Sequence, residues 1–256
     1  MPAVTAWALL LEYDGAPFVG WQRQARGASV QSVLEDAAAR LARGAPVPSV
    51  AAGRTDAGVH AAGQVAMLTL PASFGAGQVR DALNFHMRPH PIVVLRAVPA
   101  AEGWNPRFSA IRREYRYRIL NRRSRPALAS GRVWHVDRPL DAEAMAEAAI
   151  HLLGRHDFTS FRASACQAQS PVRTLDRLQV TRRGDEIEIV AEARSFLHHQ
   201  VRNMVGTLRL VGDGRWRPER VVAALTARDR RAAGPTAPPE GLCLVSVGYP
   251  ADPFSA

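Results

Sequence analysis

The sequence predicts an α+β protein built in two halves. Strand-like runs and amphipathic helix patterns follow one another, first in one half and then in the other, with residues 122–130 between the halves. The 256 residues are enough for one large domain or for two small ones that share a cleft. A hydrophobic content of 47% with 22% charged residues is ordinary for a globular protein, so disorder is not expected.

The first half begins with a strand at residues 7–13 (WALLLEY), which the turn residues Asp14 and Gly15 end. Ser29 is expected to cap a helix, because the apolar residues that follow it up to Leu41 recur with the helical period. The other expected elements of this half are strands at residues 64–70, 92–98 and 108–120 and a helix at residues 77–85.

The second half begins with an alanine-rich amphipathic helix at residues 141–153. Strands at residues 172–180 and 186–192 form a hairpin around Arg183-Gly184-Asp185. A helix at residues 197–211 follows, and its expected core stripe consists of Leu197, Val201, Met204, Val205 and Leu208. The last expected elements are a short helix at 218–225, a Pro/Gly loop at 232–240 and a strand at 242–247.

The protein is strongly basic. Lys+Arg 33 against Asp+Glu 23 gives a net charge of +10 and a sequence pI of about 11.1. Such a surface attracts nucleic acid or anionic membrane, although a coding bias towards arginine is the alternative explanation. The chain has no lysine, which excludes a Schiff-base lysine and a Walker lysine on ATP. Guanidinium groups remain, and these bind phosphates bidentately and stack on bases.

Cofactor and metal chemistry is not expected. Cys166 and Cys243 are far apart and in no metal-like spacing, which fits a reducing compartment. His198 and His199 are adjacent, and neighbouring side chains on a helix point in different directions.

The sequence shows neither a signal peptide nor an apolar run of the roughly 18 residues that a membrane span needs. We therefore expect a soluble, cytoplasmic protein.

The most informative stretch is residues 53–60 (GRTDAGVH), in which Gly53 and Gly58 bracket Asp56. A loop with glycines on both sides of a carboxylate can hold that side chain towards a ligand. The alternative is an Asx-turn, in which Asp56 only bonds to its own backbone, and from local spacing alone this alternative is favoured.

The same stretch resembles the catalytic motif of the TruA family of tRNA pseudouridine synthases without a gap. Further segments resemble motifs of this family in the right order, and together they run from about Leu11 to Tyr249. These segments are 12–15 (EYDG), 20–24 (GWQRQ), 29–31 (SVQ), 107–110 (RFSA), 115–117 (YRY), 157–162 (DFTSFR), 196–203 (FLHHQVRN) and 240–242 (EGL).

The resemblance implies the pseudouridine synthase fold, in which two similar halves with a mainly antiparallel mixed sheet, flanked by helices, surround a central basic cleft. Residues 1–121 would carry the catalytic loop and residues 122–256 would complete the cleft, as one continuous catalytic unit. The implied reaction is the isomerisation of uridine to pseudouridine in the anticodon stem-loop of tRNA, at positions 38, 39 and 40. The implied partners are tRNA and a second copy of the chain in a homodimer. The reaction is redox-neutral, and no cofactor is implied.

The resemblance assigns the role of catalytic nucleophile or base to Asp56. Its carboxylate can attack the sugar, attack the base, or remove a proton beside the anomeric carbon, and all of these routes stay open. Arg202 is the implied ionic partner of Asp56, with Gly206 one turn later allowing close approach. Tyr115 would stack on the target base, and Arg54 would help to expel that base from its stem.

Each of these three residues has an ordinary alternative. Arg202 would be a solvated surface arginine, Tyr115 a half-buried strand residue like Tyr117, and Arg54 a contact to phosphate alone.

Seven arginines between residues 112 and 125 interleave with two tyrosines and suit an RNA track. Because side chains alternate along a strand, at most about half of these arginines can meet one ligand, and the others are expected to face solvent or a partner subunit. The arginines are Arg112, Arg113, Arg116, Arg118, Arg122, Arg123 and Arg125.

Two other classes of function make different predictions. A non-catalytic RNA-binding protein on the same scaffold predicts a replaced or occluded aspartate, whereas Asp56 stands in an intact motif. A glycosidase needs two carboxylates that flank the scissile bond, and the stretch at residues 53–60 holds one. One departure from the family is Glu114, an acid directly before Tyr115 where the family tends to be basic.

Overall fold

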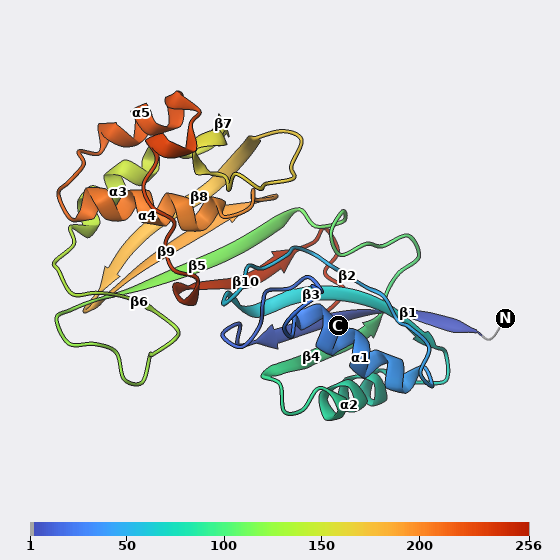
Figure 1. The fold of residues 1–256 in the computed structure, drawn as a ribbon. Coiled ribbons are helices and arrows are strands. Elements are labelled where there is room, and N and C mark those ends of the chain that lie inside the picture. Colours follow the sequence, from blue (N-terminus) through green and yellow to red (C-terminus); the bar gives the residue numbers. More distant parts are fainter. Residues whose placement is uncertain (1–2, 256) are drawn as a thin grey trace. The chain divides into compact units, whose positions relative to one another are not determined.

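The computed structural model describes residues 3–255 (Figure 1). These residues form two compact units, the first made of residues 3–111 and 244–255 and the second of residues 112–243. Each unit has its own set of antiparallel strands with helices packed on them, which confirms the predicted α+β class. The expected division into residues 1–121, which carry the catalytic loop, and residues 122–256, which complete the cleft, stays a prediction. The compact units reflect packing and do not test function.

The strands of the first unit are in the order β4-β1-β3-β10, and β2 pairs with β3. β1 lies antiparallel to both of its neighbours, and its consecutive residues Trp7, Ala8 and Leu9 are buried, so both faces of the strand are covered here. The strands are β1 (Val4–Tyr13), β2 (Ser49–Ala51), β3 (His60–Pro71), β4 (Ile92–Pro99) and residues 244–248 of β10 (Leu242–Gly248).

Two helices pack on these strands: α1 (Val30–Leu41) contacts β2 and β3, and α2 (Ala76–His86) contacts β4. Ser29 caps α1 as predicted, since its Oγ accepts from the Ser32 N–H and the Ser32 Oγ accepts from the Ser29 N–H, both at 3.0 Å. The predicted apolar stripe of α1 is buried throughout. The cap and the stripe therefore define this helix from the sequence.

The strands of the second unit are in the order β5-β9-β8-β7, all antiparallel, and β6 runs parallel to β5. The predicted strand at residues 108–120 begins later than expected, because Asn105 Oδ1 accepts from the Arg107 and Phe108 N–H groups and holds them in a turn. The strands are β5 (Arg112–Asn121), β6 (Trp134–Val136), β7 (Gly154–Asp157), β8 (Val172–Arg183) and β9 (Glu186–Ala193).

Helix α3 packs on β8 and on α4, and Figure 1 shows these helices gathered on one face of the strands with α5. The predicted core stripe of α4 is buried at all of its positions, from Leu197 to Leu208. The helices are α3 (Ala142–Ile150), α4 (Gln200–Gly212) and α5 (Glu219–Ala227), with short 3₁₀ turns η1 (Thr159–Phe161), η2 (Arg230–Ala232) and η3 (Pro239–Gly241). Within residues 3–255, no helix is both long and apolar enough to cross a bilayer.

The start of α4 corrects one expectation. His199 takes a left-handed conformation with φ 63°, so the helix begins at Gln200 and not at Leu197. The rings of His198 and His199 lie with centroids 4.0 Å apart, whereas we expected them to point in different directions on a helix. Both precede the helix, and helical geometry does not apply to them. The expectation that the protein holds no metal stays a prediction.

Candidate active site

The candidate catalytic turn, residues 53–60, connects β2 to β3 in the first unit. Asp56 is half-buried, between the buried Thr55 and the exposed Ala57. The Asp56 carbonyl accepts from the Val59 N–H at 3.1 Å, and Gly58 takes a φ of 77°, a value that glycine adopts readily. The main chain thus closes the turn, and the role of the Asp56 side chain stays a prediction.

A buried hydrogen-bond network supports the turn. The Tyr13 hydroxyl lies 2.8 Å from Thr55 Oγ1, directly beside Asp56. Gln64 Nε2 donates to the Gly53 carbonyl at 2.8 Å and to the Tyr13 hydroxyl at 3.4 Å. Tyr13, Thr55 and Gln64 are all buried, with Gln64 fully enclosed. Buried polar groups that satisfy one another fix a local geometry, because breaking any bond leaves an unpaired group away from water.

The loop after β1 packs directly against the same turn. The Trp21 N–H donates to the Thr55 carbonyl at 2.9 Å, and the Gly15 N–H donates to His60 Nδ1 at 3.1 Å. A Cβ atom on Gly15 would lie 2.1 Å from the Val59 carbonyl oxygen, so only glycine fits at this position. The EYDG and GWQRQ segments therefore form the bed on which the turn rests.

Tyr115 lies on β5 in the second unit and is half-buried. Its ring meets the ring of Phe196 edge to face, with centroids 5.3 Å apart and planes at 88°. Phe196 stands at the start of the FLHHQVRN segment, so the two segments that resemble family motifs are in contact here.

Tyr117 faces the same way as Tyr115 but is a core residue, more deeply buried than the half-buried strand residue of the alternative. It is fully buried and its hydroxyl donates to the Pro238 carbonyl at 2.8 Å. Burial, with a contribution from Glu240, raises the pKa of Tyr117 far above its usual value, and Arg202 opposes this shift only in part. Tyr117 therefore stays neutral, and its hydroxyl serves as a structural donor.

Arg202 is half-buried on the first turn of α4 and is held by main-chain atoms of Ala237. Arg202 Nε donates to the Ala237 carbonyl at 2.8 Å, while the Ala237 N–H donates to the Arg202 carbonyl at 3.1 Å. The main-chain bond holds the two segments together, and the Nε bond orients the guanidinium group. Arg202 is thus not the freely solvated surface arginine of the alternative.

Gly206 was expected to allow close approach at the pair of Arg202 and Asp56, but the segment that packs against it is residues 233–237. A Cβ atom there would lie 1.7 Å from the Pro235 carbonyl oxygen, so this glycine lets residues 233–237 approach α4. The segment is also held by Thr207 Oγ1, which accepts from the Gly234 N–H at 2.9 Å, and by Asn203 Oδ1, which accepts from Thr236 Oγ1 at 2.7 Å. Gly206 therefore helps to position Arg202 through the segment that carries Ala237.

Three arginines of β5, Arg112, Arg116 and Arg118, lie on the face opposite its tyrosines, because side chains alternate. All three form ion pairs with glutamates of β9. The pairs are Arg112 with Glu192 at 3.6 Å, Arg116 with Glu188 at 3.9 Å and Arg118 with Glu186 at 2.7 Å.

The strongest of these pairs changes the ionisation of both partners. Arg118 lowers the pKa of Glu186 through a bidentate contact, and the same contact raises the pKa of Arg118. Arg113, on the tyrosine face, is buried and donates to the Arg194 carbonyl. The interleaving in the sequence thus does not make one surface of arginines and tyrosines, which weakens the RNA-track hypothesis for β5.

The predicted site residues are divided between the units. Asp56 and the exposed Arg54 belong to the first, and Tyr115 and Arg202 to the second. Their assembly in one cleft stays a prediction.

Sequence reasoning missed the residues that support the site, which are Tyr13, Thr55, Gln64, Asn203 and Ala237. The one available signal was the position of Tyr13, Thr55 and Asn203 inside segments that resemble family motifs.

Known proteins similar to this chain share one description. A family model described as tRNA pseudouridine synthase matches residues 148–250. The protein called tRNA pseudouridine synthase A of Acidiphilium cryptum is 70% identical over 249 residues, which cover 97% of this chain and 98% of that protein. The proteins of the same name from Gluconobacter oxydans and Paramagnetospirillum magneticum are 57% and 60% identical, over 97% and 96% of this chain and 91% and 95% of their own lengths.

Proposed function

This chain belongs to the tRNA pseudouridine synthase A family, and on that premise we propose that it converts uridine to pseudouridine in tRNA. In this isomerisation the bond between the sugar C1′ and the base N1 breaks. A bond between C1′ and C5 forms, the proton leaves C5, and N1 gains a proton. Atoms and electrons balance within the substrate, so the reaction needs no oxidant, reductant or co-substrate.

Asp56 is the proposed catalytic residue, and the observation that carries the proposal is the support beneath it. A half-buried carboxylate on a turn fixed by Tyr13, Thr55 and Gln64 is held in place before the substrate arrives. Such preorganisation contributes to catalysis because little of the binding energy is then needed to position the group. Attack on the sugar, attack on the base and proton removal at C2′ would all use this carboxylate.

Three other side chains are proposed to assist Asp56 or to contact the substrate. The guanidinium of Arg202, aimed by its bond to the Ala237 carbonyl, would pair with the Asp56 carboxylate and keep it ionised. Tyr115, whose ring edge is fixed by Phe196, would stack on the flipped uracil. Arg54 is exposed and would occupy the space that the flipped base leaves, at a cost of a few kcal/mol for unstacking that base.

The proposed targets are uridines at positions 38, 39 and 40 of the anticodon stem-loop. The proposed enzyme is a cytoplasmic homodimer in which residues 1–121 and 122–256 complete one catalytic unit. The resemblance of the motifs supports these points, and light scattering tests the dimer. A dimer would have about twice the 27.9 kDa mass of one chain, and a mass of one chain with full activity would contradict it.

The experiment that tests the function maps pseudouridine in transcribed tRNAs after incubation with the protein. Each transcript keeps a uridine at only one of positions 38, 39 and 40 in its anticodon arm. We expect modification at the retained position in each transcript. Pseudouridine elsewhere would overturn the proposed positions, and tRNA binding without any pseudouridine would favour the non-catalytic RNA-binding alternative.

A further inference from the structure

The turn between α4 and α5, residues 213–218, carries an unusual density of arginine around one tryptophan. The sequence here is Asp213-Gly214-Arg215-Trp216-Arg217-Pro218, followed by Glu219 and Arg220 at the start of α5. These residues lie outside every segment that resembles a family motif.

The backbone of this turn is held by main-chain hydrogen bonds. The Gly214 N–H donates to the Val211 carbonyl and the Trp216 N–H to the Leu210 carbonyl, both at 2.9 Å, and Gly214 takes a φ of 74°. The Arg220 N–H donates to the Arg217 carbonyl at 3.0 Å. The side chains of the turn therefore project from fixed positions.

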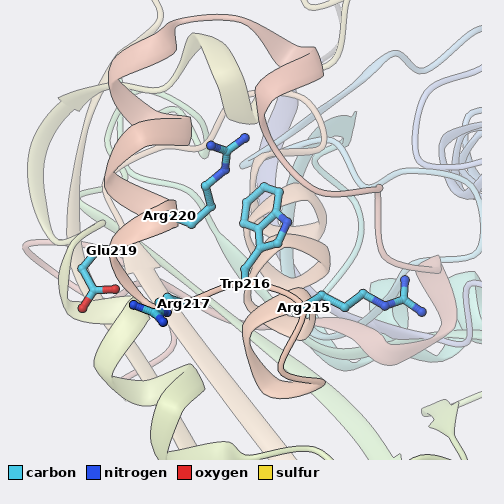
Figure 2. Close-up of a pocket in the computed structure, with 5 residues that line it drawn as sticks. All are labelled: Arg215, Trp216, Arg217, Glu219 and Arg220. Carbon is cyan, nitrogen blue, oxygen red and sulfur yellow. The ribbon is translucent and has the colours of Figure 1, made fainter.

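An open cavity of about 570 Å³ is lined by Arg215, Trp216, Arg217, Glu219 and Arg220. Figure 2 shows these five side chains. The Arg220 guanidinium lies over the Trp216 ring, 5.4 Å from its centroid, in the arrangement of a cation–π contact. Trp216 is half-buried and Arg220 is exposed, so the guanidinium lies on the solvent-accessible side of this contact.

The charges of the cluster do not cancel. The Asp213 carboxylate, which is almost fully buried, binds Arg209 at 3.0 Å and also lies 3.5 Å from Arg215. Arg217 and Arg220 are exposed, and neither forms an ion pair with any residue between 3 and 255. The arginines of β5 differ, since three of them are paired with glutamates of β9. The positive charges of Arg217 and Arg220 therefore stay available for a ligand, whereas glutamates of β9 neutralise three arginines of β5.

We propose that Arg217 and Arg220 bind phosphates of the RNA substrate, with Trp216 as the residue that positions Arg220. The proposal rests on the proposed function, because the occupant is the tRNA itself. Exposed arginines with a fixed backbone and no acidic partner suit a phosphodiester chain, which offers a regular series of anionic oxygens. Arg215 is not part of the proposed contact, because it lies 3.5 Å from the Asp213 carboxylate.

The contact would be distinct from the pocket of the target base. Arg202 stands at the start of α4 and Gly212 at its end, and ten helical residues rise about 15 Å. The turn and Arg202 are therefore held apart by one rigid helix. A tRNA with its target uridine near Arg202 would have to reach the turn with another nucleotide.

The test compares the salt dependence of tRNA binding between two double variants that lose the same charge. Arg217→Ala with Arg220→Ala removes the proposed contacts, and Arg116→Ala with Arg118→Ala removes two paired arginines of β5. Each lost phosphate contact flattens the plot of log Kd against log salt by about 0.7–0.9. Between about 50 and 200 mM salt, wild-type Kd should therefore rise about tenfold more than the Kd of the turn variant.

The β5 variant should keep the wild-type slope. Equal flattening in both variants, or none in the turn variant, would overturn the proposal. At saturating tRNA the turn variant should form pseudouridine at the wild-type rate, so that its defect lies in KM. A wild-type protein that forms no pseudouridine would instead contradict the proposed function, which separates the two failures.

A further variant tests the role of Trp216. Trp216→Phe keeps a ring beneath Arg220 and should retain wild-type affinity, whereas Trp216→Ala should weaken tRNA binding at low salt. Equal melting temperatures would show that both variants fold. If Trp216→Phe and Trp216→Ala weaken binding equally, or neither does, the positioning role of Trp216 is wrong.

Discussion

Removing the Tyr13 hydroxyl with Tyr13→Phe should destabilise the protein and slow catalysis without weakening tRNA binding. The variant keeps the ring that packs on Phe18 and Trp21, at centroid separations of 6.4 and 6.3 Å. It leaves the buried Thr55 hydroxyl without its partner at 2.8 Å. An unsatisfied buried polar group costs about 1–3 kcal/mol, which is the expected loss in free energy of unfolding.

Thr55→Val supplies the second side of a double-mutant cycle, because valine replaces the hydroxyl with a methyl group of similar size. Each single variant breaks the same hydrogen bond, and the double variant leaves neither partner unpaired. The two losses should therefore add to more than the loss in the double variant, with a coupling of about 1 kcal/mol. Urea unfolding curves measure all four proteins.

Catalysis provides the second measurement on the same set. If the network positions the Asp56 turn, kcat should fall in both single variants while Kd for tRNA stays constant. Additive losses of stability, or a wild-type kcat in both single variants, would refute the account of the turn.

Three further predictions concern the packing of the turn, of α4 and of β5. Gly15→Ala places a Cβ atom 2.1 Å from the Val59 carbonyl oxygen, so the turn must shift. As a result kcat should fall about a hundredfold, and an unchanged kcat would show that catalysis tolerates displacement of the turn. Gly206→Ala meets the Pro235 carbonyl oxygen at 1.7 Å and should cost about 1–3 kcal/mol in unfolding free energy, measured in urea, unless residues 233–237 move without cost. Arg118→Ala should cost less than about 1 kcal/mol at pH 7, because the pair with Glu186 is partly exposed. Arg118 lowers the pKa of folded Glu186, so this contribution is complete above the ordinary glutamate pKa of 4.5 and disappears as the pH falls through the lowered value; a difference that persists at pH 2 would contradict it.

Elements with a local cause were predictable from the sequence. The helix from Val30 has both a cap at Ser29 and a regular apolar stripe, and the hairpin between β8 and β9 turns at Gly184, where φ is positive. The expected starts of β5 and α4 were wrong for reasons that hydrophobic periodicity does not contain. Asn105 holds the residues before β5 in a turn, and His199 adopts a left-handed conformation before α4.

The candidate site shows the same division. The GRTDAGVH motif predicted the position of Asp56 on a turn, because its glycines are local signals. The supporting bond from Gln64 to Gly53 and the bond from Arg202 to Ala237 join residues far apart in the chain, and no local pattern encodes them. The interleaved arginines of β5 misled for a related reason, since their glutamate partners lie on another strand.

The most direct test of the central claim is tritium release from C5 of uridine in a transcribed tRNA, with wild type, Asp56→Ala and Asp81→Ala. Asp81 is an exposed acid in the same unit, so its variant controls for the loss of one negative charge. We expect release by wild type and by Asp81→Ala, and none by Asp56→Ala although it still binds tRNA. Release by Asp56→Ala at the wild-type rate would contradict the assignment of Asp56 as the catalytic carboxylate.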